Sequence, residues 1–369
     1  MKAFDEIFID ETKYGVKVQT SEYRDCGKYV IIDQGQNQIA GYTDREEGVF
    51  EHVPVIIFGD HTRIIKYIDE PFFLGADGVK VLSCKDNNAN YKYLYYALKN
   101  AKIPDTGYNR HFKWLRKICI KYPDVDRQKE IVIVLDMMSD IIKKRKKEIK
   151  YLDDLIKARF VELFGSIYDG KFEMKTLPEI VIDNKNSIKR GPFGGALKKD
   201  DFVDEGYLVY EQRHAIHNDF EYAKYYITQE KYDDMIGFKV IPGDLIISCS
   251  GVTLGRIAEI PEGAREGIIN QALLKISLNP EVMLNTFFIQ QFRGDEIQEI
   301  LFGFSRGSGI PNMPSMGEVK AVKFICPPLE LQRQYCDFVK QVDKLKLQVQ
   351  KSLDETQILF DSLMQQYFG

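Results

Sequence analysis

The octapeptide PPLELQRQ, residues 327–334, precedes a segment without further proline that runs to Gly369. An earlier stretch, PDVDRQKE at residues 123–130, aligns with it without a gap. The offset is 204 residues, the difference between 327 and 123, and Gly165 then aligns with Gly369. Proline fixes φ and is tolerated at a helix start, where its missing N–H has no partner to lose. The repeated stretch therefore predicts two helix starts, and we interpret the chain as an internal repeat.

Both prolines are followed by a long helical pattern. Asp126 and Glu330 are acids in the first turn, where the helix dipole favours negative charge. Apolar residues then recur in steps of three and four, which predicts helices over 126–163 and 330–367, each roughly 57 Å long at about 1.5 Å per residue. A sustained 3.5-residue repeat keeps one seam of a helix against a partner helix. We therefore expect the two helices to form an antiparallel coiled coil, and the alternative is that each docks on a separate globular core. The predicted helix-pair interface consists of Ile131, Leu135, Met138, Ile142, Ile149, Leu152, Ile156, Val339, Val342, Val349, Leu353, Phe360 and Leu363.

The composition limits the cellular setting and the function. The chain has 369 residues, 44% of them hydrophobic, and a formal net charge of −4. No apolar run approaches the roughly 20 residues of a membrane span, and the acidic N-terminal segment is not a signal peptide. Six cysteines without a CxxC spacing are interpreted as reduced core thiols of a cytoplasmic protein, with neither zinc nor disulfides. The net charge gives no support to nucleic-acid binding, so such a surface would have to be local.

The segments before the two helices show the same landmarks in the same order. GKYVIIDQ at 27–34 is matched by GYLVYEQ at 206–212, and VPVIIFGDHTR at 53–63 by GDLIISCSGVTLG at 243–255. GADGVKVL at 75–82 is matched by INQALLKI at 269–276, and a short amphipathic helix is predicted after each. Short strands between glycine turns, closed by helices, predict an α+β fold class with mixed or antiparallel sheets. The molecule should thus have a pseudo-twofold internal repeat.

This layout resembles the specificity subunit of type I restriction-modification enzymes. The similarity covers nearly the whole chain and includes the strings FGDHTR, RGPFGGALKK, GDLIISCSG and PPLELQRQ. The resemblance implies target-recognition domains at 1–122 and 166–326 and conserved helices at 123–165 and 327–369. It implies that each domain reads one half of a bipartite asymmetric site in double-stranded DNA, with the helix pair setting the spacing. It further implies a non-catalytic chain without its own cofactor or metal. S-adenosylmethionine, ATP and Mg²⁺ would belong to partner subunits, two methyltransferase chains and the motor-nuclease chains.

Base edges and phosphates are read mainly by Arg, Lys, Asn, Gln and small polar residues. On this basis we select polar and glycine residues in the loops after the predicted strands. The alternative for each is a solvated loop residue or a turn former, and we expect a minority of them to contact DNA. The candidate DNA-binding residues are Gln34, Gly35, Gln36, His61, Thr62, Arg63, Lys66, Asn109 and Arg110 in the first domain, and Lys189, Arg190, Lys198, Lys199, Gln212, Arg213, Ser250, Thr253, Arg256 and Arg306 in the second.

Two patterns that imitate catalytic sites are weaker. Asp124, Glu148 and Lys150 resemble the PD…ExK pattern of metal-dependent nucleases, but the last two lie inside the predicted helix. His214 and His217 have the spacing of two metal ligands without a companion cluster, and loop histidines near a sheet are commoner. Two other functions remain open: the recognition fragment of a fused methyltransferase-nuclease, and a paired-helix scaffold that binds only protein.

Overall fold

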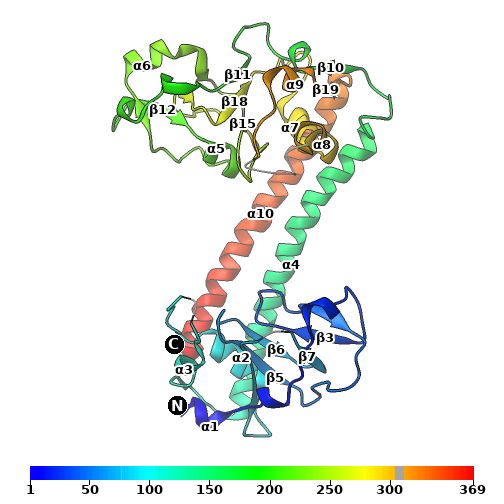
Figure 1. The fold of residues 1–369 in the computed structure, drawn as a ribbon, viewed down its shortest axis with the longest axis vertical. Coiled ribbons are helices and arrows are strands. Elements are labelled where there is room, and N and C mark those ends of the chain that lie inside the picture. The colour runs from blue at the N-terminus through cyan, green and yellow to red at the C-terminus, as the bar shows by residue number, and fades with distance from the viewer. Residues whose placement is uncertain (76, 108, 304–310) are drawn as a thin grey trace. The chain divides into compact units, whose positions relative to one another are not determined.

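A computed structural model describes residues 1–75, 77–107, 109–303 and 311–369 (Figure 1). The chain forms two compact units: unit 1 comprises residues 1–148 and 349–369, and unit 2 comprises residues 149–348. Two helices of 40 residues, α4 (Val125–Phe164) and α10 (Leu329–Phe368), each contribute one part to each unit. Both are one residue longer at each end than the sequence pattern predicted. At the start of α4 the reason is that the side chain of Asp124 accepts a hydrogen bond from the backbone N–H of Arg127 at 2.9 Å.

Unit 1 contains a four-stranded sheet, a three-stranded sheet and a two-stranded pair. The four-stranded sheet has the order β2 (Phe8–Asp10), β8 (Val79–Cys84), β5 (Val55–Gly59), β6 (Ile65–Ile68), and is antiparallel throughout. The three-stranded sheet has the order β4 (Gly41–Thr43), β3 (Tyr29–Ile32), β7 (Phe72–Leu74). The pair joins β1 (Lys2–Ala3) to β9 (Cys119–Ile120), and the helices are α1 (Phe4–Ile7), α2 (Tyr91–Lys99) and α3 (Phe112–Leu115).

Unit 2 has two four-stranded sheets and a two-stranded pair. One sheet has the order β11 (Ile188–Arg190), β18 (Leu273–Ile276), β15 (Leu245–Ser248), β16 (Ile257–Glu259). The other has the order β13 (Tyr226–Ile227), β12 (Tyr207–Tyr210), β17 (Gly267–Ile269), β14 (Lys239–Val240). The pair joins β10 (Met174–Thr176) to β19 (Lys323–Ile325), and the helices are α5 (Gln212–His217), α6 (Gln229–Asp234), α7 (Asn285–Arg293), α8 (Asp295–Phe302) and α9 (Met316–Ala321).

The two units repeat one topology. In each, one strand pairs in parallel with a second strand, β3 with β7 and β12 with β17, and all other pairs between named strands are antiparallel. The strands of each matched sequence pair occupy matched positions: β3 and β12, β5 and β15, β8 and β18. The predicted short helices are α2 and α7. The internal repeat and the α+β class are therefore confirmed.

Within each unit the two long helices pack against each other and against a short helix. In unit 1, Ile131 and Leu135 of α4 share a buried cluster with Met364 of α10 and with Tyr93 and Leu94 of α2. In unit 2, Ile156 and Phe164 of α4 share a cluster with Tyr335, Val339 and Val342 of α10 and with Phe287 of α7. Each residue of the predicted helix-pair interface is buried or half-buried. The pattern missed Met364, which is 6% exposed, because Leu363 beside it fits the strict repeat equally well.

A buried glutamine fixes the start of each long helix. Gln332 is fully buried, and its amide nitrogen donates to the carbonyls of Pro327 at 2.9 Å and Val282 at 3.0 Å. Its amide oxygen accepts the backbone N–H of Leu284, the N-cap of α7, at 2.9 Å. The repeated spacing from proline to glutamine therefore has a structural cause, since the glutamine joins the helix to the strand exit and to the neighbouring short helix.

Unit 1 repeats this arrangement with Gln128, which is also fully buried. Its amide nitrogen donates to the carbonyl of Pro123 at 2.9 Å, and its amide oxygen lies 3.4 Å from the backbone nitrogen of Asn90, the N-cap of α2. The prolines and glutamines of PDVDRQ and PPLELQ thus form one structural element used twice.

The burial of the cysteines differs in part from the sequence-based interpretation. All six cysteines are free, but Cys26 and Cys119 are exposed and are not core thiols. Cys119 is exposed because it lies in the short strand β9, whose other residue, Ile120, points into the core. Among the described residues, no helix is both long and apolar enough to cross a membrane.

Replacing Gln332 with alanine should destabilise unit 2. The change leaves the N–H of Leu284 and the carbonyl of Val282 without their side-chain partner, which costs about 1–3 kcal/mol. We expect a lower urea midpoint and faster hydrogen exchange in the first turn of α7. The control is Gln334→Ala, an exposed position on the same helix, which should leave both unchanged. Equal effects of the two substitutions would contradict the role given to Gln332.

Candidate nucleic-acid interface

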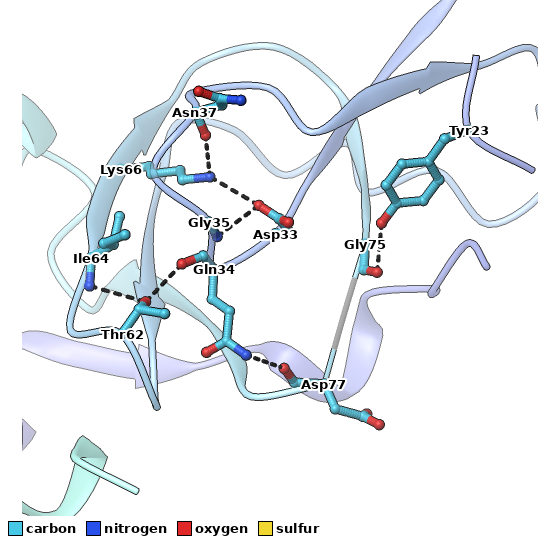
Figure 2. Close-up of polar contacts among 10 residues, drawn as sticks. All are labelled: Tyr23, Asp33, Gln34, Gly35, Asn37, Thr62, Ile64, Lys66, Gly75 and Asp77. Atoms are coloured by element: carbon cyan, nitrogen blue, oxygen red, sulfur yellow. Dashed lines mark hydrogen bonds and ion pairs between the residues drawn. The ribbon is translucent and has the colours of Figure 1, made fainter. Parts of the chain in front are cut away.

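The first group of candidate residues lies where β3 ends in unit 1. Gln34 follows this strand, and its amide nitrogen donates to the carbonyl of Asp77 at 3.0 Å (Figure 2). Its amide oxygen accepts the N–H of His61 at 3.2 Å, and its backbone carbonyl accepts the hydroxyl of Thr62 at 2.7 Å. Gln34 therefore connects three loops. Sequence reasoning selected it as a base reader, but its amide group is used to hold neighbouring loops together.

Gln212 has the same position after β12 in unit 2. Its amide nitrogen donates to the Oγ of Ser250 at 2.8 Å and lies 3.3 Å from the carbonyl of Ala272. Asp77 and Ala272 each lie three residues after the end of the parallel partner strand, β7 or β17. The two glutamines thus make the same kind of bridge, which brings the ends of β3 and β5, or of β12 and β15, to one place in each unit.

Lys66 is deeply buried, with 2% of its side chain exposed. Its ammonium group donates to the backbone carbonyl of Asn37 at 2.5 Å and to the carboxylate of Asp33 at 3.3 Å (Figure 2). Burial lowers the pKa of Lys66, and the Asp33 charge acts in the opposite direction. Asp33 also accepts the N–H of Gly35 at 2.8 Å. Lys66 and Gly35 therefore shape the loop after β3, and neither presents a free polar side chain at the surface.

The other candidates of unit 1 divide into paired and unpaired groups. Arg63 is bound to Asp105 at 2.6 Å, and the Asn109 amide donates to the Thr106 carbonyl at 2.5 Å. Gln36 and Arg110 are exposed, and within the described parts of the chain neither side chain has a hydrogen bond or ion pair. In unit 1 these two are the candidates whose side chains remain available to a ligand.

In unit 2 several candidates also have intramolecular partners. The Arg190 guanidinium donates to Asn312 at 3.0 Å, and Arg213 lies 3.7 Å from Asp219 and over the ring of Tyr222. Lys189 lies over the ring of Phe238, and the Thr253 carbonyl accepts from the hydroxyl of Ser248. Arg306 lies outside the described residues. Lys198, Lys199 and Arg256 are exposed and, within the described ranges, their cationic groups have no partner.

Arg256 lines a cavity of about 540 Å³ that also includes Lys157 of α4 and Arg293 of α7. Arg293 donates to the backbone carbonyl of Ile257 at 2.9 Å, and burial together with the charge of Arg256 lowers its pKa. Among the described residues that line this cavity, Asp295 is the one acid. Three cations on three separate elements therefore face one cavity. Sequence reasoning missed Lys157 and Arg293 because both lie on helices, far along the chain from the loop of Arg256.

The patterns that imitate catalytic sites have structural explanations. His214 is fully buried: its Nδ1 accepts the N–H of Glu211 at 2.9 Å and its Nε2 donates to the carbonyl of Tyr222 at 3.0 Å. Both ring nitrogens are therefore occupied within the fold. Glu148 and Lys150 lie inside α4, not at strand ends. This placement agrees with the sequence-based argument against a nuclease site.

Comparison with known proteins identifies the fold and the family. Residues 4–151 and 189–356 both match the family model of the type I restriction modification DNA specificity domain. The chain belongs to this family. It is 31% identical over 189 residues to the specificity subunit of the Escherichia coli type I restriction enzyme EcoR124I/EcoR124II. That alignment covers 46% of this chain and 44% of the relative, so it spans less than half of the relative's length.

Two solved structures share the fold of this type I specificity chain. The S subunit of a type I restriction-modification system from M. genitalium has a TM-score of 0.60 and 18% identity, covering 100% of this chain and 95% of that one. A structure described as the basis of complex assembly and conformational transition of the type I R-M system has a TM-score of 0.56 and 14% identity, covering 100% and 99%. Both similarities extend over the full length of this chain, so its overall fold is shared with these structures.

Replacing Lys66 with methionine should destabilise unit 1 by about 1–3 kcal/mol, because Asp33 and the Asn37 carbonyl lose a buried donor. The measurement is the urea midpoint of unfolding. Lys102→Met, at an exposed position in the same unit, provides the control. A midpoint equal to that of the control would show that the buried ammonium group contributes nothing to the loop after β3.

Proposed function

We propose that this chain is the DNA sequence-recognition subunit of a type I restriction-modification complex. Each unit would read one half of a bipartite site in double-stranded DNA. The single observation that carries the proposal is the double match to a DNA specificity domain, which coincides with the two structural repeats. Because the loops after β3 and β12 differ in sequence, the two half-sites should differ, and the whole site should be asymmetric.

The long helices would set the distance between the half-sites. A helix of 40 residues is about 60 Å long at about 1.5 Å per residue. Half-sites read on one face of a duplex are separated by one helical turn, about 34 Å, or a multiple of it. The helix length is therefore of the right order to separate two reading domains along one DNA duplex.

The chain itself would be non-catalytic and would act in the cytoplasm. Adenine methylation and DNA cleavage would come from two methyltransferase subunits and from motor-nuclease subunits, which would bind S-adenosylmethionine, ATP and Mg²⁺. An exposed apolar stripe on α4 in unit 1 supports a docking role. Ile133, Met137 and Ile141 follow one another at four-residue intervals and are 59%, 61% and 37% exposed. Such a stripe on a helix is typical of a protein-interaction surface.

Exchanging the recognition domains would test the two-reader arrangement. Replacement of residues 1–122 with the first recognition domain of another family member should change one half of the methylated motif and leave the other intact. The measurement is the base-resolution methylome of cells that express the chimera with the partner methyltransferase. A change in both halves would contradict independent reading. If deletion of the gene leaves every methylated motif in place, a protein-only scaffold is favoured instead.

The cationic cavity of unit 2 should contribute to the salt dependence of DNA binding. The double substitution Arg256→Gln and Lys157→Gln removes two cations that have no intramolecular partner within the described residues. Each lost phosphate contact should reduce the slope of log K against log salt by about 0.9. The slope is measured by titrating duplex DNA with the chain and its methyltransferase partner at several salt concentrations. Lys185→Gln, an exposed lysine in the same unit, should leave the slope unchanged.

A further inference from the structure

The ends of β12 and β17 place two polar side chains side by side. These strands pair in parallel, with Val209 opposite Ile268 and Tyr210 opposite Ile269. Successive side chains of a strand point to opposite faces. The next residues, Glu211 and Asn270, therefore share the face of Val209 and Ile268. The parallel alignment continues to this point, because the N–H of Asn270 donates to the carbonyl of Tyr210 at 2.9 Å.

Glu211 and Asn270 line one cavity of about 480 Å³, together with Val209, Lys199 and the rings of Phe202 and Tyr225. The two rings stack on each other with centroids 4.7 Å apart. A cavity of this volume falls in the usual range for small organic ligands, about 300–1,000 Å³. Glu211 and Asn270 come from the strand ends, whereas Lys199 and the two aromatic rings come from the segments around them.

The fold leaves two polar groups of this cavity without partners among the described residues. The Glu211 carboxylate has no hydrogen bond or ion pair within the described residues, although this residue is the N-cap of α5. The pKa of Lys224 is raised chiefly by the Tyr225 hydroxyl, and the Glu211 charge makes only a smaller contribution in the same direction. The Asn270 oxygen accepts the N–H of Ala272 at 3.0 Å, whereas its amide nitrogen has no partner in the described part of the chain. The cavity therefore presents a free acceptor next to a free donor.

The matching place in unit 1 is closed. Asp33, which follows β3 as Glu211 follows β12, is bound to Lys66 and to the N–H of Gly35 (Figure 2). Gly75 stands where unit 2 has Asn270, and its carbonyl accepts the hydroxyl of Tyr23 at 2.6 Å. A Cβ at Gly75 would lie too close to the Tyr23 hydroxyl oxygen. The open acceptor and donor are thus specific to unit 2 and are not required by the shared fold.

We propose that Glu211 and Asn270 read the major-groove edge of one adenine in the half-site bound by unit 2. Adenine presents an amino donor at N6 beside an acceptor at N7. The N6 amino group would donate to the Glu211 carboxylate, and the Asn270 amide nitrogen would donate to N7. Lys199, exposed at the rim, is placed for the phosphate of that strand. This inference rests on the proposed function, and it names two specificity-determining residues and the base that they read.

The test combines two protein variants with two modified bases. The chain is co-purified with its methyltransferase partner. The complex is then titrated with DNA duplexes that carry the motif identified in the methylome. At each adenine of the half-site assigned to unit 2, the base is replaced by purine, which lacks the N6 amino group, or by 7-deazaadenine, which lacks the N7 acceptor. A bidentate base contact is worth roughly 5- to 150-fold in discrimination. The wild-type chain should therefore lose about tenfold in affinity at one adenine with either modified base.

The protein variants should remove these losses selectively. Glu211→Ala should bind the purine and adenine duplexes equally, and Asn270→Asp, which keeps the acceptor for Ala272, should bind the 7-deazaadenine and adenine duplexes equally. Glu205→Ala, an exposed acid of the same unit, should behave as wild type, and all variants should keep the other half-site. The assignment would be overturned if both variants lost as much affinity for the modified duplexes as the wild type does. It would also be overturned if the half-site of unit 2 contained no adenine. A wild-type complex with no sequence preference would refute the proposed function itself.

A free nucleoside carries the same N6 donor and N7 acceptor as an adenine in DNA. A titration with adenosine distinguishes these two ligands. Calorimetric titration of the wild-type chain with adenosine should show no binding at micromolar concentrations, because a lone base lacks the phosphate contacts of DNA. Micromolar binding that Glu211→Ala abolishes, with unchanged recognition of the modified duplexes, would assign the cavity to a free nucleoside. That result would overturn the reading of a DNA base.

Discussion

The buried glutamine at the start of each long helix is the interaction on which the rest of the architecture depends. Gln332 joins the carbonyl of the proline before α10 to the first turn of α7, and Gln128 does the same for α4 and α2. A buried amide with unmet hydrogen bonds is costly, so these bonds fix the angle at which the chain leaves the sheet. In each unit, the strand exit and the neighbouring short helix are thereby attached to the long helix through one buried polar side chain.

A second pair of glutamines explains how one topology supports two different sets of side chains at the strand ends. Gln34 and Gln212 hold the loops at the strand ends together, so the residue before each can vary without loss of the loop framework. In unit 1 that residue, Asp33, is neutralised by the buried Lys66. In unit 2 it is Glu211, which faces a cavity. A shared framework with different side chains at one position is compatible with the proposed reading of two different half-sites.

Much of the fold could be predicted because the same helix-start and strand patterns occur twice in the chain. The helix pair follows from the 3.5-residue period, and the correspondence between strands of the two halves follows from landmarks that recur in the same order along the chain. The individual site residues were harder. Lys66 and Gln34 have the chemistry of DNA contacts, yet the fold uses both internally, since burial and hydrogen-bond partners depend on segments far away in sequence. Lys157 and Arg293 were missed for the converse reason, because only folding brings them to Arg256.

The sequence by itself determined the repeat, the two long helices and the α+β class, because periodicity, helix-start residues and strand length are local properties that recur at a fixed offset. The tertiary structure decided which polar side chains remain free for a ligand. In the sequence, Asp33 and Glu211 are both acids that precede a glutamine, and nothing distinguishes their availability to a ligand. Whether a lysine reaches it, or a cavity opens beside it, is set by strands and loops distant along the chain, because availability is a property of all the atoms that surround a group.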